Sequence, residues 1–118
     1  MEKKYLHIKN DYEFRRAYNK GKSYVSPVLV IYCFKRRQPC VRIGITTGKK
    51  VGNAVHRSRA RRVIREAYRH LIPQDASGWD IIFVARTRTA LVKEQEIEQS
   101  MAELLRKAGV IAAPPAEN

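Results

Sequence analysis

The sequence predicts an α+β fold, a single domain in which helices pack on a sheet as a two-layer sandwich. The length of 118 residues is that of one domain, and hydrophobic residues, at 44%, suffice for a modest core. Segments with helical spacing of apolar residues alternate with short runs rich in β-branched residues. The predicted order is helix, two or three strands, helix, strand, helix within residues 1–109. Residues 110–118 lack a pattern, and we expect a flexible tail there.

The first half of the chain predicts a short helix followed by strands. Asn10 and Asp11 can cap a helix over DYEFRRAYNK, which Gly21 would end. The run PVLVIYCF (27–34) is rich in β-branched and aromatic residues, as strands are. CVRIGITTG (40–48) alternates apolar and polar residues, which is typical of a half-buried strand. Because only a short turn separates these two runs, we expect them to pair as a hairpin.

The second half predicts two amphipathic helices on either side of a buried strand. Asn53 can cap a helix over residues 54–71, where apolar residues recur every three or four positions. After a loop over residues 72–79, DIIFVA (80–85) is apolar on both faces and should be central in the sheet. A last helix over about residues 93–109 should turn its apolar side inward. Its inward residues are Ile97, Met101, Leu104 and Leu105.

The charge predicts a polyanionic partner. The net charge is +13. The stretch from Phe14 to Gln74 contains sixteen lysines or arginines and only one acidic residue, Glu66. An anionic membrane would also attract such charge, but no basic segment carries the exposed apolar face that insertion needs. No apolar run has the length of a membrane span or of a signal peptide, so we expect a cytoplasmic protein.

The basic side of the 54–71 helix is the main candidate binding surface. On a helical projection Ser58, Arg62, Arg65 and Arg69 lie opposite the apolar stripe, with Arg59 and Arg61 beside them and Arg57 nearer the apolar edge. Such a row is often just a solvated surface. Here, however, the helix has a single acid, so pairing within the helix does not explain the arginines. Backbone N–H groups at the helix start, next to Lys49 and Lys50, also favour phosphate.

Three aromatic residues allow two interpretations. Phe14 and Tyr18 lie four positions apart on one helix face, and Tyr32 lies on the first long strand. That spacing by itself favours core packing. The cations around them include Arg15 and Lys22, and aromatic rings beside cations also stack on unpaired bases.

The residues that could carry chemistry are isolated. His7, His56 and His70 have no cysteine or carboxylate at ligand spacing, and no metal or phosphate-loop motif occurs. Asp80 precedes an apolar strand, where a carboxylate is ordinarily a cap or a pair partner. Cys33 and Cys40 could face each other across a hairpin, but we expect free, buried thiols.

The stretch KKVGNAVHRSRARRVIREAYR (49–69) resembles the signature of the bacterial ribonuclease P protein subunit family. That pattern has lysines, a glycine-containing turn, Ala-Val and then an R-N-R-x-(K/R)-R-x-x-R-E/Q run. The matching positions are Lys49, Lys50, Gly52, Asn53, Ala54, Val55, Arg57, Arg59, Arg61, Arg62, Arg65 and Glu66. Ser58 replaces the asparagine of R-N-R and retains only a hydroxyl. The resemblance extends from about Leu6 to Gly109.

The resemblance implies a function and its residues. The chain would be the accessory subunit of an endoribonuclease that removes the 5′ leader of precursor tRNA. The catalytic RNA would carry the chemistry with Mg²⁺ that the RNA holds, and no protein residue would be catalytic. A rare left-handed β-α-β crossover would enclose the arginine helix, against the usual hand. Binding to the RNA subunit would involve Lys49, Lys50, Asn53, His56, Arg57, Ser58, Arg59, Arg61, Arg62, Arg65 and Arg69. Binding to the leader would involve Phe14, Arg15, Tyr18, Lys22, Tyr32 and Thr46.

Two other classes compete with this interpretation. A non-catalytic RNA-binding protein, such as a ribosomal protein, could use the same basic helix. A metal-dependent nuclease acting alone is disfavoured, because the sequence offers no carboxylate cluster of the kind that holds catalytic metals.

Overall fold

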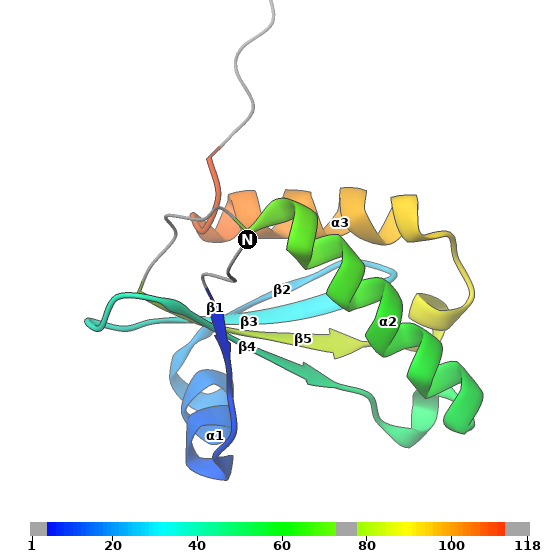
Figure 1. The fold of residues 1–118 in the computed structure, drawn as a ribbon, viewed down its shortest axis with the longest axis horizontal. Helices are drawn as coiled ribbons and strands as arrows, with labels where there is room; N and C mark the ends of the chain where they lie inside the picture. The colour runs from blue at the N-terminus through cyan, green and yellow to red at the C-terminus, as the bar shows by residue number, and fades with distance from the viewer. Residues whose placement is uncertain (1–4, 73–77, 113–118) are drawn as a thin grey trace, which may run out of the picture.

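Five strands and three α-helices make up the fold. Figure 1 shows the computed structural model of the chain, which describes residues 5–72 and 78–112. The first part contains β1 (Tyr5–His7), α1 (Asp11–Lys20), β2 (Lys22–Val25), β3 (Leu29–Lys35), β4 (Val41–Thr46), the 3₁₀ turn η1 (Lys49–Val51) and α2 (Ala54–Leu71). The second part contains β5 (Trp79–Ala85), the 3₁₀ turn η2 (Thr87–Ala90) and α3 (Glu94–Ala108). The predicted α+β class and the order of helices and strands are confirmed, with β1 as an additional strand.

The sheet has the strand order β1-β4-β5-β3-β2. β5 is its central strand and pairs in parallel with β4 and antiparallel with β3. The predicted hairpin between β3 and β4 is therefore wrong: Phe34 and Arg42 both lie opposite Asp80 of the strand between them. Because β5 is apolar on both faces, it is most stable with a strand on each edge. The parallel pair β4 and β5 is joined through α2 as a β-α-β unit, and its left-handed crossing stays a prediction.

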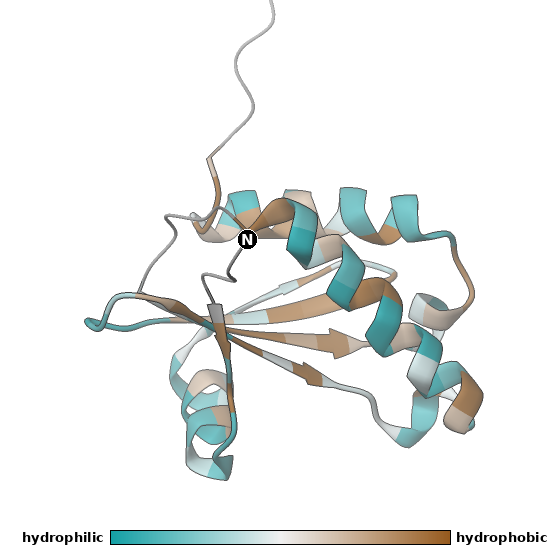
Figure 2. Ribbon diagram, in the orientation of Figure 1, coloured by the Kyte–Doolittle hydropathy of each residue, from teal (hydrophilic) through white to brown (hydrophobic). Residues whose placement is uncertain are grey.

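Helices cover both faces of the sheet. In Figure 1, α2 and α3 lie on one face and α1 lies on the other. The predicted two-layer sandwich corresponds to the sheet with α2 and α3, while α1 adds a short third layer. The main core lies under α2 and α3 and includes Ile31, Ile43, Ile64, Phe83 and Met101. A smaller cluster of Ile8, Ala17 and Ile82 lies under α1. Figure 2 shows the same division, with apolar strands between helices that are polar on their outer sides.

The ends of the chain and its loop agree only partly with the sequence prediction. β1 was missed because three residues, YLH, are too few to show an alternating pattern. Val110 is buried with the main core and Ile111 packs against it, so the tail predicted from residue 110 does not begin there. Residues 73–77 of the predicted loop over 72–79 lie outside the described part of the chain. The same is true of residues 113–118 of the predicted tail. No helix in residues 5–72 and 78–112 combines the length and apolar character that crossing a membrane requires.

The two cysteines are free thiols in different environments. Cys33 is buried, as predicted, whereas Cys40 is only half-buried, in the link between β3 and β4. Burial raises the pKa of the Cys33 thiol to about 12, because its thiolate would lose hydration.

Iodoacetamide at pH 8 should therefore label Cys40 in the folded protein and leave Cys33 unmodified, as mass spectrometry of the peptides would show. In urea both cysteines should react, which provides the control. Comparable labelling of Cys33 without denaturant would contradict this environment.

Candidate nucleic-acid interface

The start of α2 is capped by a side chain and contains no acidic residue. Gly52 precedes it with a φ of 130°, a conformation that favours glycine, and a Cβ there would meet the His56 side chain at 3.0 Å. The Asn53 side chain then accepts a hydrogen bond from the His56 backbone N–H at 3.1 Å, which confirms the predicted cap. The first turn contains no acidic residue. Lys49 and Lys50 in η1 are exposed next to this first turn. Their charges add to the partial positive charge that a helix has at its N-terminus.

The outer side of α2 carries exposed arginines without partners. Arg61, Arg62 and Arg65 are exposed, and they form no ion pair or side-chain hydrogen bond within the described residues. Arg69 pairs with Glu66 at 3.1 Å, in an exposed pair of a kind that contributes little to stability. We call the exposed set the basic surface. It comprises Lys49, Lys50, Asn53, Ser58, Arg61, Arg62, Arg65 and Arg69, with the half-buried His56 among them.

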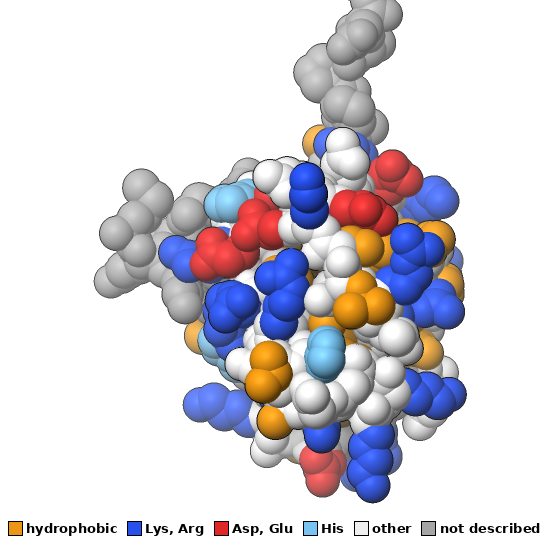
Figure 3. All heavy atoms as spheres, turned by 90° about the vertical axis from the view of Figure 1, so that its right-hand side faces the viewer, with side chains coloured by type: hydrophobic (Ala, Val, Ile, Leu, Met, Phe, Trp, Pro, Cys, Tyr) orange, Lys and Arg blue, Asp and Glu red, His pale blue; other side chains and the backbone are white. Residues whose placement is uncertain are grey.

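Figure 3 views the molecule from the side on which α2 begins. Lys and Arg side chains are spread across this side, whereas most of the acidic side chains gather in its upper part. Basic groups that are exposed and lack partners remain available to phosphates.

Two arginines of the motif serve the fold as well. Arg57 is half-buried, and its Nε donates to the Gly52 carbonyl at 3.1 Å. Arg59 donates from Nε to the Ala90 carbonyl and from Nη2 to the Val92 carbonyl, both at 3.0 Å. The structure therefore turns Arg59 toward the segment that links η2 to α3. The sequence did not show this role, because both acceptors lie over 30 residues away.

Arg59→Ala should lower the free energy of unfolding by about 1–3 kcal/mol, because two partly buried carbonyls would lose a charged donor. Urea unfolding followed by circular dichroism measures the change. Arg61→Ala, which removes an exposed side chain without partners from the same helix, should stay within about 0.5 kcal/mol of the parent. Equal losses for both variants would contradict the role of Arg59.

The aromatic residues form a half-exposed group between α1 and the sheet. The rings of Tyr18 and Tyr32 meet edge to face at 4.8 Å, and Phe14 and Tyr18 lie 6.5 Å apart. Phe14 packs on the bare backbone of Gly44, where a Cβ would come within 2.7 Å of the ring. Tyr18 is nevertheless 37% exposed. The group thus has a buried base and an open edge, so each of the two sequence interpretations describes part of it.

The other predicted leader residues lie in different places. Thr46 alternates with Gly44 along β4, so it faces α1 like the aromatic rings, and it is half-buried. Arg15 is exposed on α1. Lys22 pairs with Cys33, whose side chain is in the main core, and therefore lies on the opposite face of the sheet. Ser23, which pairs with Tyr32, is exposed on the aromatic side and was missed, since only the register reveals it.

A buried ionic cluster also lies on the α1 side of the sheet. Asp80 is fully buried, and the guanidinium groups of Arg16, Arg36 and Arg42 approach it at 3.2, 2.7 and 2.8 Å. Arg42 also pairs with Glu13 of α1. The hydrogen bond to Asp80 is the main cause that raises the pKa of Arg42 above its ordinary value. The interpretation of Asp80 as a pair partner is confirmed, and three of the chain's arginines serve the fold here.

Fold and surface together define a small α+β protein with an exposed cationic helix on one face of its sheet and an aromatic group on the other, which is a nucleic-acid-binding class.

The chain belongs to the ribonuclease P protein family. The family model described as Ribonuclease P matches residues 1–109. The ribonuclease P protein component of Clostridium novyi is 43% identical over 110 residues, which are 92% of this chain and 97% of that protein. A structure of the Staphylococcus aureus RNase P protein is 31% identical, with a TM-score of 0.75 and 98% of each chain covered. The Thermotoga maritima RNase P protein, 24% identical with a TM-score of 0.73 over 91% of this chain and 97% of that one, supports the fold alone.

Proposed function

We propose that the basic surface binds the catalytic RNA of ribonuclease P, so that the chain acts in the 5′ maturation of tRNA. Family membership makes the chain the protein component of this endoribonuclease. The observation that supports RNA binding most strongly is the row of Arg61, Arg62 and Arg65, which are exposed and have no partner in the described residues. A cytoplasmic location belongs to the same proposal.

The aromatic group is the proposed binding site for the single-stranded leader of precursor tRNA. Tyr18 and Tyr32 offer ring surface on which bases can stack, and Arg15 on α1 adds a positive charge. Thr46 lies on the same face of the sheet, whereas Lys22 does not and is left out of this site. Only the precursor has a leader, so contacts here would favour substrate over mature product.

In this proposal the chain contributes binding and charge, and the RNA contributes the reaction. Two RNA molecules repel each other, and the cationic chain reduces that repulsion when it contacts both. The Mg²⁺ ions that hydrolysis requires would be held by the RNA. The lysines and arginines of the basic surface do not fit such an ion, because their side chains are cations and Mg²⁺ requires oxygen ligands.

Reconstitution tests the proposal. The purified chain, mixed with a bacterial ribonuclease P RNA at low Mg²⁺, should restore 5′ cleavage of precursor tRNA, and neither component alone should do so. A ribosomal protein would give no rescue, and a nuclease acting alone would cleave without the RNA. Either result would contradict the proposal.

Replacing two rings of the aromatic group, the half-buried Phe14 and the exposed Tyr18, tests the leader site. Phe14→Ala with Tyr18→Ala should weaken the binding of precursor tRNA by at least about fivefold, since stacking contributes about 1–3 kcal/mol per base. The binding of mature tRNA should not change. Filter binding of both RNAs to the reconstituted holoenzyme measures the difference.

Tyr12→Ala is the matched control for this pair. Tyr12 is 57% exposed on the same helix, one turn before Arg16. Its replacement should affect neither RNA. Equal losses for precursor and mature tRNA in the Phe14 and Tyr18 variant would assign those rings to the core only.

A further inference from the structure

Three potential metal ligands meet between α2 and α3, outside the basic surface and the aromatic group. His70 lies in the last turn of α2, and Glu94 and Glu98 lie one turn apart at the start of α3. One ligand atom from each of the three residues lies within 4.8 Å of the other two. His70 Nδ1 is 2.8 Å from Glu98 Oε1. Residues from two helices thus converge, although 24 or more positions separate His70 from the two glutamates.

The two helices hold these side chains on a rigid frame. α2 and α3 pack on the same side of the sheet (Figure 1), where Ala67 of one and Ile97 and Met101 of the other are fully buried in one core. The backbones under the three ligands are therefore fixed by packing. A site on packed helices keeps its geometry better than a site on a loop.

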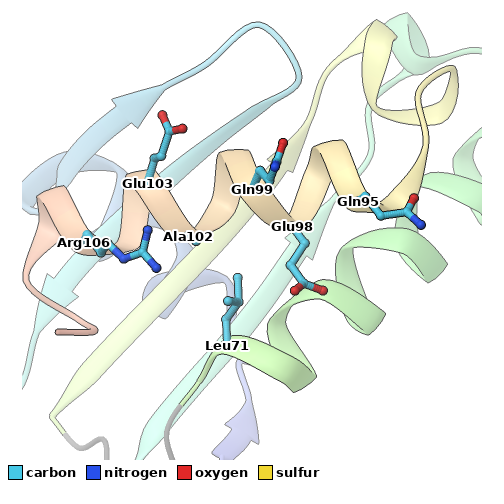
Figure 4. Close-up of a pocket in the computed structure, with 7 residues that line it drawn as sticks. All are labelled: Leu71, Gln95, Glu98, Gln99, Ala102, Glu103 and Arg106. Atoms are coloured by element: carbon cyan, nitrogen blue, oxygen red, sulfur yellow. The ribbon is translucent and has the colours of Figure 1, made fainter. Parts of the chain in front are cut away.

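The surroundings leave room for solvent to complete a coordination shell. A shallow groove of about 630 Å³ adjoins Glu98 and continues along α3 past Gln95 and Gln99. Figure 4 shows the Glu98 carboxylate extending from α3 toward α2, in the space between the two helices. Arg69, the nearest arginine of α2 in sequence, is paired with Glu66 instead.

We propose that His70, Glu94 and Glu98 bind one Zn²⁺ ion that links the end of α2 to the start of α3. One imidazole nitrogen and two carboxylate oxygens are three of the four ligands that zinc takes, with water in the fourth position. The double positive charge of the ion would balance the negative charges of the two carboxylates. Mg²⁺ is a poor competitor here, because it prefers oxygen ligands in octahedral geometry over imidazole. This site does not rest on the proposed RNA function.

Calorimetric titration of the untagged full chain with Zn²⁺ tests the site. The parent should bind one ion, and His70→Gln or Glu94→Gln should weaken that binding by at least about tenfold, because losing a direct ligand should cost no less than losing one of the residues that support the ligands. A tenfold excess of Mg²⁺ should leave the parent's zinc affinity within about twofold. His56→Gln, which removes another histidine of α2, and Glu103→Gln, which removes another glutamate of α3, are the matched controls and should bind like the parent.

Thermal unfolding gives an independent measurement. Zn²⁺ should raise the melting temperature of the parent and of both controls, because the ion binds the folded state, and it should not raise that of His70→Gln. His70 is exposed, so its replacement should leave the fold intact, and the circular dichroism spectrum checks this. If the parent binds no zinc, or binds it equally without His70 and without Glu94, the proposal is wrong.

Discussion

Asp80→Asn is expected to cost about 3–5 kcal/mol of unfolding free energy, because it leaves buried arginines without their counter-charge. Asp80 is fully buried, and the side chains of Arg36 and Arg42 are only 6% and 19% exposed. An asparagine can accept some of the hydrogen bonds but cannot supply the negative charge. A domain of this size has about 5–15 kcal/mol of stability in total, so the variant should be close to unfolding.

Urea unfolding followed by circular dichroism measures this loss. Glu66→Gln is the control, since it also removes a carboxylate that pairs with an arginine, but in a pair that is 51% and 40% exposed. Its cost should be below about 1 kcal/mol. A loss for Asp80→Asn as small as that of Glu66→Gln would show that the cluster does not hold α1, β4 and β5 together.

Arg62→Ala with Arg65→Ala should weaken binding to the ribonuclease P RNA and make it less dependent on salt. Affinity falls as salt rises, and each lost phosphate contact reduces the steepness of log affinity against log salt by roughly 0.7 to 0.9, because fewer counterions are released. Two lost contacts should therefore lower the slope by roughly 1.4 to 1.8. Both side chains are exposed and have no partner in the described part of the chain, so stability should hardly change.

The matched control removes the same charge elsewhere. Arg106 and Lys107 are exposed at the end of α3, outside the basic surface, and replacing both with alanine also lowers the net charge by two. This variant should keep the parent's slope when affinities are measured between 50 and 200 mM salt, a range over which such contacts are resolved. An unchanged slope in the Arg62 and Arg65 variant, or equal changes in both variants, would refute the assignment of α2.

Local patterns were enough to predict the helices and the candidate surface. The apolar stripe of α2 includes the fully buried Ala60, Ile64 and Ala67, and its opposite side holds the exposed Arg62 and Arg65. Periodicity decides this directly, because a helix that packs by one stripe must expose the other side. The central place of β5 follows in the same way from a run that is apolar on both faces.

Contacts distant in sequence could not be predicted in this way. The short turn between β3 and β4 predicts a hairpin, and this prediction is wrong. β5 lies between the two strands, although it begins 33 residues after the end of β4, and the turn carries no information about it. The same limit applies to Arg59, which looks like its exposed neighbours in sequence but bonds to Ala90 and Val92. The family resemblance implies that Lys22 lies on the aromatic side, whereas its register with Cys33 places it on the opposite face of the sheet.

Local sequence patterns predict the α+β class, the three helices and the cationic side of α2, since each depends on neighbours within a few residues. Tertiary structure alone decided which arginines stay free for a partner and which neutralise Asp80. It also decided that His70 meets Glu94 and Glu98. Net charge depends only on composition, whereas the availability of a charged side chain to a partner depends on which distant group lies within a few ångströms of it.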